Sequence, residues 1–241
     1  MTILMTNDDG INSPGLLPLA HALRKAGHRV FVLAPEDNRS GVSHCISFLN
    51  GPVRLTNNGE DTWSCPGNPV DCVVLALLGG LPEMGGVPDL VLSGINQGAN
   101  IGTDIVYSGT AAAARQGSLI GIPSVALSLI ENQEYYWDMA VSFSVKRLEE
   151  LKALWRPGTF VNVNIPNTPD GPLGLASAFP ALRDYQDTLS LYEAHDGRRY
   201  CFVKPGEVTT RPEAGSDWDV VSRNMASVSA IYIHPVTREG A

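Results

Sequence analysis

Two adjacent aspartates near the start of the chain, Asp8 and Asp9, are of a type and in a place that could hold a metal ion. They follow an apolar segment, residues 3–5, that is expected to form the first strand of a sheet. In open α/β sheets ligands bind beyond the carboxyl ends of the strands, so both carboxylates would face the ligand. Grouped carboxylate oxygens are typical ligands of magnesium or manganese. Taken alone, Asp-Asp-Gly is also compatible with a plain polar turn.

The loop after the second predicted strand supplies further polar groups. That strand covers residues 29–33, and the loop at residues 35–41 contains Asn38, Ser40 and Gly41. An amide, a hydroxyl and a glycine backbone would then lie at the same edge of the sheet as the two aspartates. A solvated turn is the alternative for this loop by itself.

A glycine-rich segment, residues 93–102, follows the strand predicted for residues 90–92. Its three glycines allow the backbone to approach a ligand closely, and Asn96 and Asn100 add two amide groups. Plain connecting loops can have the same composition. Its place directly after a strand favours a part in the same site.

The helix predicted for residues 109–116 starts with Ser108, Gly109 and Thr110. Free N–H groups, the positive end of the helix dipole and two hydroxyls could together bind a phosphate. Ser108 could also be a simple N-cap. The chain has no Gly-x-Gly-x-x-Gly after its first strand and no Gly-Lys-Ser/Thr, so a phosphate site here is not of a common nucleotide-loop type.

Strand-like and helix-like segments alternate through residues 1–166, which indicates an α/β core. The further predicted segments are strands at 124–129 and 160–165 and helices at 15–26, 70–78 and 135–154. Asp71 is expected to cap or anchor the second of these helices. We expect a Rossmann-like fold of three layers, in which helices cover both faces of a mostly parallel sheet.

Two parts of the chain depart from this alternation. Three short runs within residues 44–65, namely 46–48, 53–55 and 62–64, predict an antiparallel hairpin insertion. Residues 167–241 are expected to form a β-rich C-terminal lobe or arm, with strands at 200–203 and 228–233. Exposed strand edges there could pair with another subunit, so this segment is a candidate for oligomerisation.

The composition limits the class of protein. The 241 residues carry a formal net charge of −8, which argues against binding a nucleic acid duplex through its phosphates. No segment approaches the roughly 18 uninterrupted apolar residues of a membrane span, and no signal-peptide pattern is present, so we expect no membrane partner. Four scattered cysteines fit a reducing compartment, and we expect a cytoplasmic location.

Four motifs occur in an order and spacing that resemble a known family. They are Thr6-Asn7-Asp8-Asp9-Gly10 with Pro14-Gly15, Ala34-Pro35 with Asn38-Arg39-Ser40-Gly41, Gly67-x-Pro69-x-Asp71-Cys72-Val73, and Ser93-Gly94-Ile95-Asn96-x-Gly98-x-Asn100 with Tyr107-Ser108-Gly109-Thr110-Ala111-Ala112-Ala113. On these motifs the chain resembles the SurE-type nucleotidases, the survival protein E family.

The resemblance implies a metal site, an activity and an assembly. One divalent cation, either magnesium or manganese with cobalt as a further option, would be held by Asp8, Asp9, Ser40 and Asn96. The implied activity is hydrolysis of nucleoside 5'- and 3'-monophosphates and, in some members, of short polyphosphate. Family members are similar in forming dimers or tetramers that exchange C-terminal segments, so a homodimer or homotetramer is expected.

From these assignments we expect water to attack the phosphate in line, with Asp8 or Asp9 as the catalytic general base. The residues expected to bind the phosphate or the rest of the substrate are Asn38, Gly41, Asn100, Ser108, Gly109 and Thr110. A covalent aspartyl-phosphate is the alternative mechanism. A non-catalytic, metal-dependent nucleotide-binding module is the alternative function.

Two other protein classes place aspartates after the first strand but fit less well. A signalling receiver domain requires a lysine at a late strand end, and the only lysines are at 25, 146, 152 and 204, none of them near Ser128. A haloacid-dehalogenase-type phosphatase requires two aspartates separated by one residue, whereas these are adjacent.

Overall fold

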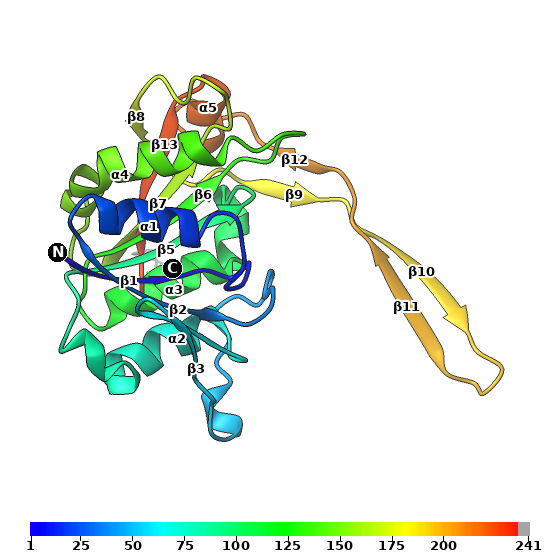
Figure 1. The fold of residues 1–241 in the computed structure, drawn as a ribbon. Helices are drawn as coiled ribbons and strands as arrows, with labels where there is room; N and C mark the ends of the chain where they lie inside the picture. Colours follow the sequence, from blue (N-terminus) through cyan, green and yellow to red (C-terminus); the bar gives the residue numbers. More distant parts are fainter. Residues whose placement is uncertain (236–241) are drawn as a thin grey trace.

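The computed structural model describes residues 1–235, and its centre is a nine-stranded sheet (Figure 1). The strands of this sheet are β1 (Thr2–Thr6), β2 (Arg29–Pro35), β3 (Thr56–Gly59), β4 (Thr62–Cys65), β5 (Leu90–Gln97), β6 (Ser124–Leu129), β7 (Thr159–Ile165), β8 (Leu175–Ser177) and β13 (Ala226–Tyr232). Their order is β3-β4-β2-β1-β5-β6-β7-β13-β8. From β4 to β7 in this order all neighbours are parallel, while β3 is antiparallel to β4 and β13 to β7. The mostly parallel sheet predicted from the sequence is confirmed.

Helices cover both faces of the sheet, so the predicted three-layer arrangement is also confirmed (Figure 1). One face carries α1 (Leu17–Lys25) and α4 (Trp137–Ala153), and the other carries α2 (Pro69–Leu75) and α3 (Gly109–Leu119). Because both faces are covered, strands such as β6 are buried along their whole length, which explains their mostly apolar sequence. Short helical turns are η1 (Phe48–Asn50), η2 (Ala76–Gly80), η3 (Pro82–Met84) and η4 (Gly102–Val106). Within residues 1–235, no helix has the length and apolar character that a membrane crossing requires.

The strand order reverses between β1 and β5, at the middle of the parallel region. From β1 the chain continues to β2 on one side, and β5 later pairs with the other side of β1, with Thr6 opposite Ser93. Such a reversal leaves a crevice at the carboxyl ends of the two strands, which is where open α/β sheets bind ligands. Asp8 follows β1 and Asn96 lies near the end of β5, so the fold brings them to this crevice.

The hairpin predicted within residues 44–65 differs from the one observed. Residues 46–48 and 53–55 form no strand, so this part of the prediction was wrong. The backbone N–H groups of Ser47 and Phe48 are not paired with a strand, because they donate hydrogen bonds to the Asp71 carboxylate. The observed hairpin is β3–β4, and β4 pairs in parallel with β2, which makes it part of the central sheet. The expected anchoring of α2 is confirmed, since Asp71 also accepts a hydrogen bond from the N–H of Asn68 at 2.7 Å.

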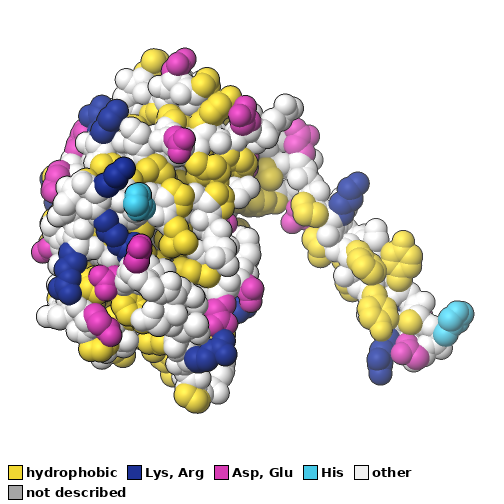
Figure 2. Space-filling model, viewed as in Figure 1, with side chains coloured by type: hydrophobic (Ala, Val, Ile, Leu, Met, Phe, Trp, Pro, Cys, Tyr) yellow, Lys and Arg dark blue, Asp and Glu magenta, His cyan; other side chains and the backbone are white. Residues whose placement is uncertain are grey.

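A long antiparallel arm projects from the body after β8 (Figure 1). Its root pairs β9 (Arg183–Tyr185) with β12 (Val208–Thr210), and its outer part pairs β10 (Thr188–Glu193) with β11 (Arg199–Lys204). Every residue of β10 and β11 is exposed, and apolar side chains gather along the outer arm (Figure 2). After the arm the chain forms α5 (Asp217–Ser222) and returns to the sheet as β13.

The C-terminal segment predicted to begin at residue 167 thus contributes both the arm and the strands β8 and β13 to the structure. Its last residues, 236–241, lie outside the described part of the chain. The division into a core of residues 1–166 and a segment for oligomerisation stays a prediction.

Candidate active site

Asp8, just after β1, is held by the start of α3. Its Oδ1 accepts a hydrogen bond of 2.6 Å from the Thr110 hydroxyl, and its Oδ2 accepts one of 3.0 Å from the Thr110 backbone N–H. A Cβ on Gly109 would lie 2.8 Å from the Cβ of Asp8, so only a glycine allows this close approach. Burial raises the pKa of Asp8, and the hydrogen bonds from Thr110 oppose this rise. The carboxylate is fixed, and it lies at the positive end of the helix dipole.

Asp9 lies beside Asp8 and is tied to the end of β5. Its Oδ2 accepts a hydrogen bond of 2.9 Å from the backbone N–H of Gln97. Burial raises the pKa of Asp9 to about 6, and the negative charge of Asp8 contributes to this rise. No lysine, arginine or histidine within residues 1–235 forms an ion pair with either aspartate. A divalent cation is the kind of ligand that stabilises two such neighbouring carboxylates.

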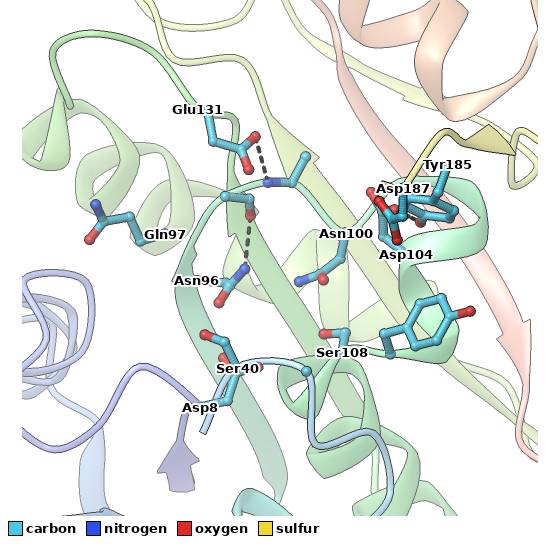
Figure 3. Close-up of a pocket in the computed structure, with 14 residues that line it drawn as sticks. Asp8, Ser40, Asn96, Gln97, Asn100, Asp104, Ser108, Glu131, Tyr185 and Asp187 are labelled. Atoms are coloured by element: carbon cyan, nitrogen blue, oxygen red, sulfur yellow. Dashed lines mark hydrogen bonds between the residues drawn. The ribbon is translucent and has the colours of Figure 1, made fainter. Parts of the chain in front are cut away.

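Asn96 and Ser40 present their polar groups to the same space as Asp8 (Figure 3). The Nδ2 of Asn96 donates to the carbonyl of Gly98 at 2.9 Å, which leaves its Oδ1 for a ligand. The backbone N–H of Ser40 donates to the Oδ1 of Asn38 at 2.7 Å, so Asn38 shapes the turn that carries the Ser40 hydroxyl. The four predicted metal ligands therefore lie at the carboxyl ends of β1, β2 and β5.

The strand β5 is longer than the sequence predicted. The predicted glycine-rich loop begins inside β5, which continues to Gln97. The pairing of β5 with β6 is irregular between Ser93 and Asn96, as in a β-bulge. Bulges change the direction in which a side chain points, and this irregularity lies directly before Asn96, a predicted metal ligand.

The donor set fits a hard divalent cation, because two carboxylates, one hydroxyl and one amide all offer oxygen. In the part of the chain that the structure describes, no three His, Cys, Asp or Glu side chains are grouped so that they could hold a metal. The predicted set contains only two such side chains, so Ser40 and Asn96 must supply the remaining protein ligands. That these residues bind a cation stays a prediction.

A cavity of about 590 Å³ opens at this edge of the sheet, within the size range of small-molecule sites. Six of the residues predicted for the site line it: Asp8, Ser40, Gly41, Asn96, Asn100 and Ser108. The other four do not line it but each contacts a residue that does: Asp9 contacts Gln97, Asn38 contacts Ser40, and Gly109 and Thr110 contact Asp8. The structure thus gives Thr110, which is fully buried, a role that sequence reasoning missed: it holds Asp8.

Asn100 is fixed by a buried network from β6 and β7. Its N–H donates to the Oδ1 of Asn164 at 2.8 Å, and its carbonyl accepts from Asn162 at 2.9 Å and from Asn164 at 3.1 Å. Its Nδ2 donates to the hydroxyl of Ser128 at 2.7 Å. The Oδ1 is therefore the polar group of Asn100 that is left for a ligand.

Ser108 is the N-cap that the sequence suggested, and its contact with a phosphate stays a prediction. Its hydroxyl oxygen accepts a hydrogen bond of 3.0 Å from the N–H of Ala111, which makes it the N-cap of α3. The same residue lines the cavity. Because the oxygen accepts from the helix, the hydroxyl hydrogen is free to be donated to a phosphate.

Further residues line the cavity that sequence reasoning did not assign to the site. Glu131, whose Oε2 accepts from the N–H of Ala99 at 3.2 Å, follows β6, so the rule of polar residues at strand ends could have found it (Figure 3). Tyr185 and Asp187 come from the root of the arm. Arg183-x-Tyr185-x-Asp187 is a weaker motif of the family resemblance, but it does not indicate a place at the site, which follows from the fold.

Fold and cavity together define a class: a doubly wound α/β protein with an acidic ligand site at the point where its strand order reverses. The sequence model of the family described as "Survival protein SurE" matches residues 3–186. A "5'-nucleotidase SurE" of Methylobacterium radiotolerans is 40% identical over 245 residues, which cover 97% of this chain and 93% of that protein. One of Geotalea daltonii is 37% identical over 239 residues, with the same two coverages.

A solved structure agrees with the sequence comparisons. The crystal structure of the SurE protein from Aquifex aeolicus matches with a TM-score of 0.84 and 33% identity, and the match covers 98% of this chain and 95% of that one. The chain belongs to the SurE family.

Proposed function

We propose that this SurE-family protein is a 5'-nucleotidase, a metal-dependent phosphomonoester hydrolase that acts on nucleoside 5'- and 3'-monophosphates and on short polyphosphate. The observation that carries the proposal is the pair Asp8 and Asp9, two adjacent carboxylates without an ion-pair partner within residues 1–235, beside a cavity at the strand reversal. Relatives that match nearly the whole chain are named 5'-nucleotidases, which supports the same activity here.

Asp8, Asp9, Ser40 and Asn96 would hold one magnesium or manganese ion, with cobalt as a further option. When bound, such a cation polarises a phosphoryl oxygen and lowers the pKa of a coordinated water. Asp8 suits the role of a fixed ligand, because Thr110 already engages both of its oxygens.

Asp9 suits the role of general base. Its Oδ1 is left without a protein hydrogen bond when Gln97 occupies Oδ2, so this oxygen can accept a proton from an attacking water. In the proposed step a water oxygen attacks phosphorus in line, its proton passes to Asp9, the ester P–O bond breaks, and the leaving oxygen takes a proton from solvent as the nucleoside is released. Ser108 and the backbone of Gly41 orient the phosphate, and the start of α3 favours its negative charge.

The test is phosphate release by the purified protein in manganese, with 5'-AMP, 3'-AMP, tripolyphosphate and p-nitrophenyl phosphate as substrates. We expect turnover of all four by the wild type and loss of at least about a hundredfold in Asp9→Asn, since general-base groups contribute this much. Asp196→Asn, an exposed change at the arm tip, should retain full activity. Tight nucleotide binding without turnover by the wild type would refute the proposal and favour a binding module.

The mechanism has its own test, which is to quench turnover of labelled substrate with acid. Direct attack by water predicts no labelled protein. An acid-stable, hydroxylamine-labile phosphoprotein would instead establish a covalent aspartyl-phosphate.

We also propose that the protein forms a homodimer or homotetramer through its arm and works in the cytoplasm. Exposed apolar side chains along β10 and β11 support the first statement, because large exposed apolar surfaces mark interaction sites. All four cysteines are free thiols, which supports a reducing compartment.

A further inference from the structure

The cavity has a wall that the proposed reaction leaves unused. We call it the far wall and define it as Tyr107, Tyr185 and Asp187, all of which line the cavity. Figure 3 shows Asp8 and Ser40 at one end of the cavity and Tyr185 and Asp187 at the other, with Ser108 between them. A substrate whose phosphate lies at the Asp8 end must extend the rest of its body toward the far wall.

The two tyrosines of the far wall are held in place by a neighbouring ion pair. Asp104 accepts a hydrogen bond from the hydroxyl of Tyr185 and another from the guanidinium of Arg183. Burial and the hydrogen bond to Asp104 raise the pKa of Tyr185, so its hydroxyl keeps its proton and goes on donating. The ring of Tyr107 packs edge-on against Tyr185, with ring centroids 6.1 Å apart and planes at 88°. Both rings remain partly exposed at the cavity and offer an apolar surface to a planar ligand.

Asp187 differs from Asp104 in having an oxygen left over. Its Oδ1 accepts a hydrogen bond of 3.1 Å from the N–H of Gly206, and its Oδ2 has neither a hydrogen-bond donor nor an ion-pair partner within residues 1–235. A Cβ at position 206 would lie 1.7 Å from the carbonyl oxygen of Gln186, so only glycine lets this N–H reach Asp187. The carboxylate is thus positioned by the arm root, and its free oxygen is a strong hydrogen-bond acceptor.

We propose that the far wall binds the nucleoside half of the substrate: the base lies against Tyr107 and Tyr185, and Asp187 accepts a hydrogen bond from a ribose hydroxyl. This inference rests on the proposed function, and it names the feature of the substrate that the enzyme selects. A carboxylate at this position favours a sugar that carries hydroxyls over a deoxy sugar. It should not change the hydrolysis of a simple aryl phosphate, which has no sugar.

The test compares kcat/KM of the wild type and Asp187→Asn for 5'-AMP, its 2'-deoxy and 3'-deoxy analogues, and p-nitrophenyl phosphate. Asparagine keeps an oxygen for the N–H of Gly206 but places an NH₂ group where the free acceptor was. We expect the wild type to prefer 5'-AMP over at least one deoxy analogue by about tenfold, the effect of one hydrogen bond to a charged group. The variant should lose that preference and hydrolyse p-nitrophenyl phosphate at the wild-type rate. The matched control Asp184→Asn, an exposed neighbour paired with Arg211, should change none of these values.

Two results would overturn the far-wall proposal. One is an unchanged preference for 5'-AMP in Asp187→Asn, and the other is an equal loss on p-nitrophenyl phosphate, which would show a general disturbance of the site. If the wild type hydrolyses none of these compounds, the proposed function fails instead. Calorimetric binding of adenosine, which has no phosphate, then tests whether the far wall binds a nucleoside. Asp187→Asn must bind adenosine more weakly than the wild type does, and the wild type must bind 2',3'-dideoxyadenosine more weakly than adenosine. If either affinity is unchanged, the inference is wrong.

Discussion

Asp8 and Asp9 are neighbours in sequence but have different surroundings. Asp8 is buried and accepts two hydrogen bonds from Thr110, whereas Asp9 accepts one from Gln97 and keeps an oxygen free. These partners come from α3 and β5, so two elements far apart in the sequence set the geometry of one dipeptide. The different environments suggest a division of work, with Asp8 as a fixed ligand and Asp9 as the base.

Without metal, Asp9 should make stability fall as pH rises. Its pKa is 3.8 in an unfolded chain and about 6 in the folded one, so the folded state binds the proton more tightly. The stability from this difference is fully present below pH 3.8 and is lost as pH rises through about 6, by an amount on the order of 3 kcal/mol. Urea denaturation in EDTA should show wild type losing stability relative to Asp9→Asn between about pH 4 and pH 7. A difference that does not change with pH would contradict this view of Asp9.

At pH 7.5 manganese should make the wild type more stable than Asp9→Asn, the reverse of the order expected in EDTA. A ligand that binds only the folded state raises its stability, and it should do so for wild type and much less for Asp9→Asn. The melting temperature with and without manganese is the measurement, and it requires no turnover. An equal increase in both proteins would place the bound ion elsewhere.

Thr110 should act on the metal through Asp8. Thr110→Val keeps the shape of the side chain and the backbone N–H but removes the 2.6 Å hydrogen bond to Oδ1. Groups that orient metal ligands commonly change affinity by about 10- to 100-fold, so manganese should bind at least about tenfold more weakly. Thr110→Ser retains the hydroxyl and should recover most of the affinity in a calorimetric titration. Wild-type affinity in the valine variant would show that Asp8 does not need this support.

At the scale of elements, the sequence predicted the strands and helices whose positions depend mainly on the burial of apolar side chains. β6 was predicted at its observed bounds, and β1, β2, β7 and the four main helices within a few residues, because long buried apolar runs are specific signals. The hairpin was misplaced because Asp71, a single buried carboxylate in α2, holds the backbone of Ser47 and Phe48. Polar anchoring across some twenty residues leaves no periodic pattern to read. The same reason hid the contact of Thr110 with Asp8.

Asp71 should therefore matter for stability more than its position in the first turn of a short helix suggests. It is fully buried and accepts hydrogen bonds from the N–H and hydroxyl of Ser47, from Phe48 and from Asn68. Asp71→Asn places donors against donors, and we expect a loss of about 2–3 kcal/mol in the free energy of unfolding, from the value of hydrogen bonds to a charged group. The exposed turn variant Asp61→Asn is the control and should stay within about 0.5 kcal/mol of wild type. Equal midpoints of urea denaturation for the two variants would contradict the anchoring role.

At the scale of the whole molecule, the arm is the feature that the sequence only outlined. Strands at 200–203 and 228–233 were predicted close to β11 and β13, but β9, β10 and β12 were not. β10 alternates Leu189 and Leu191 with Thr188 and Ser190, a strand pattern that the sequence reasoning missed. The contribution of the arm root to the cavity follows from the path of the chain and not from any local pattern.

Shortening the arm should reduce the size of the assembly. Residues 190–202 can be replaced by Asn-Gly, which joins Leu189 to Val203 in register through a two-residue turn. The change removes Leu191, Tyr192, Tyr200 and Phe202, four of the six large exposed apolar side chains of β10 and β11, but keeps Tyr185 and Asp187. Light scattering after size exclusion should show fewer subunits than for wild type, with hydrolysis of p-nitrophenyl phosphate retained. An assembly of unchanged size would show that the arm does not hold the subunits together.

The central claim is that donors from the ends of β1, β2 and β5 converge on a single cation. Anomalous diffraction at the manganese edge from crystals soaked in manganese chloride tests it most directly. We predict one strong peak per subunit with Asp8, Asp9, Ser40 and Asn96 around it, at the roughly 2.0–2.6 Å typical of oxygen ligands to such cations. A peak bound by other residues, or these four side chains turned away from the ion, would contradict the account.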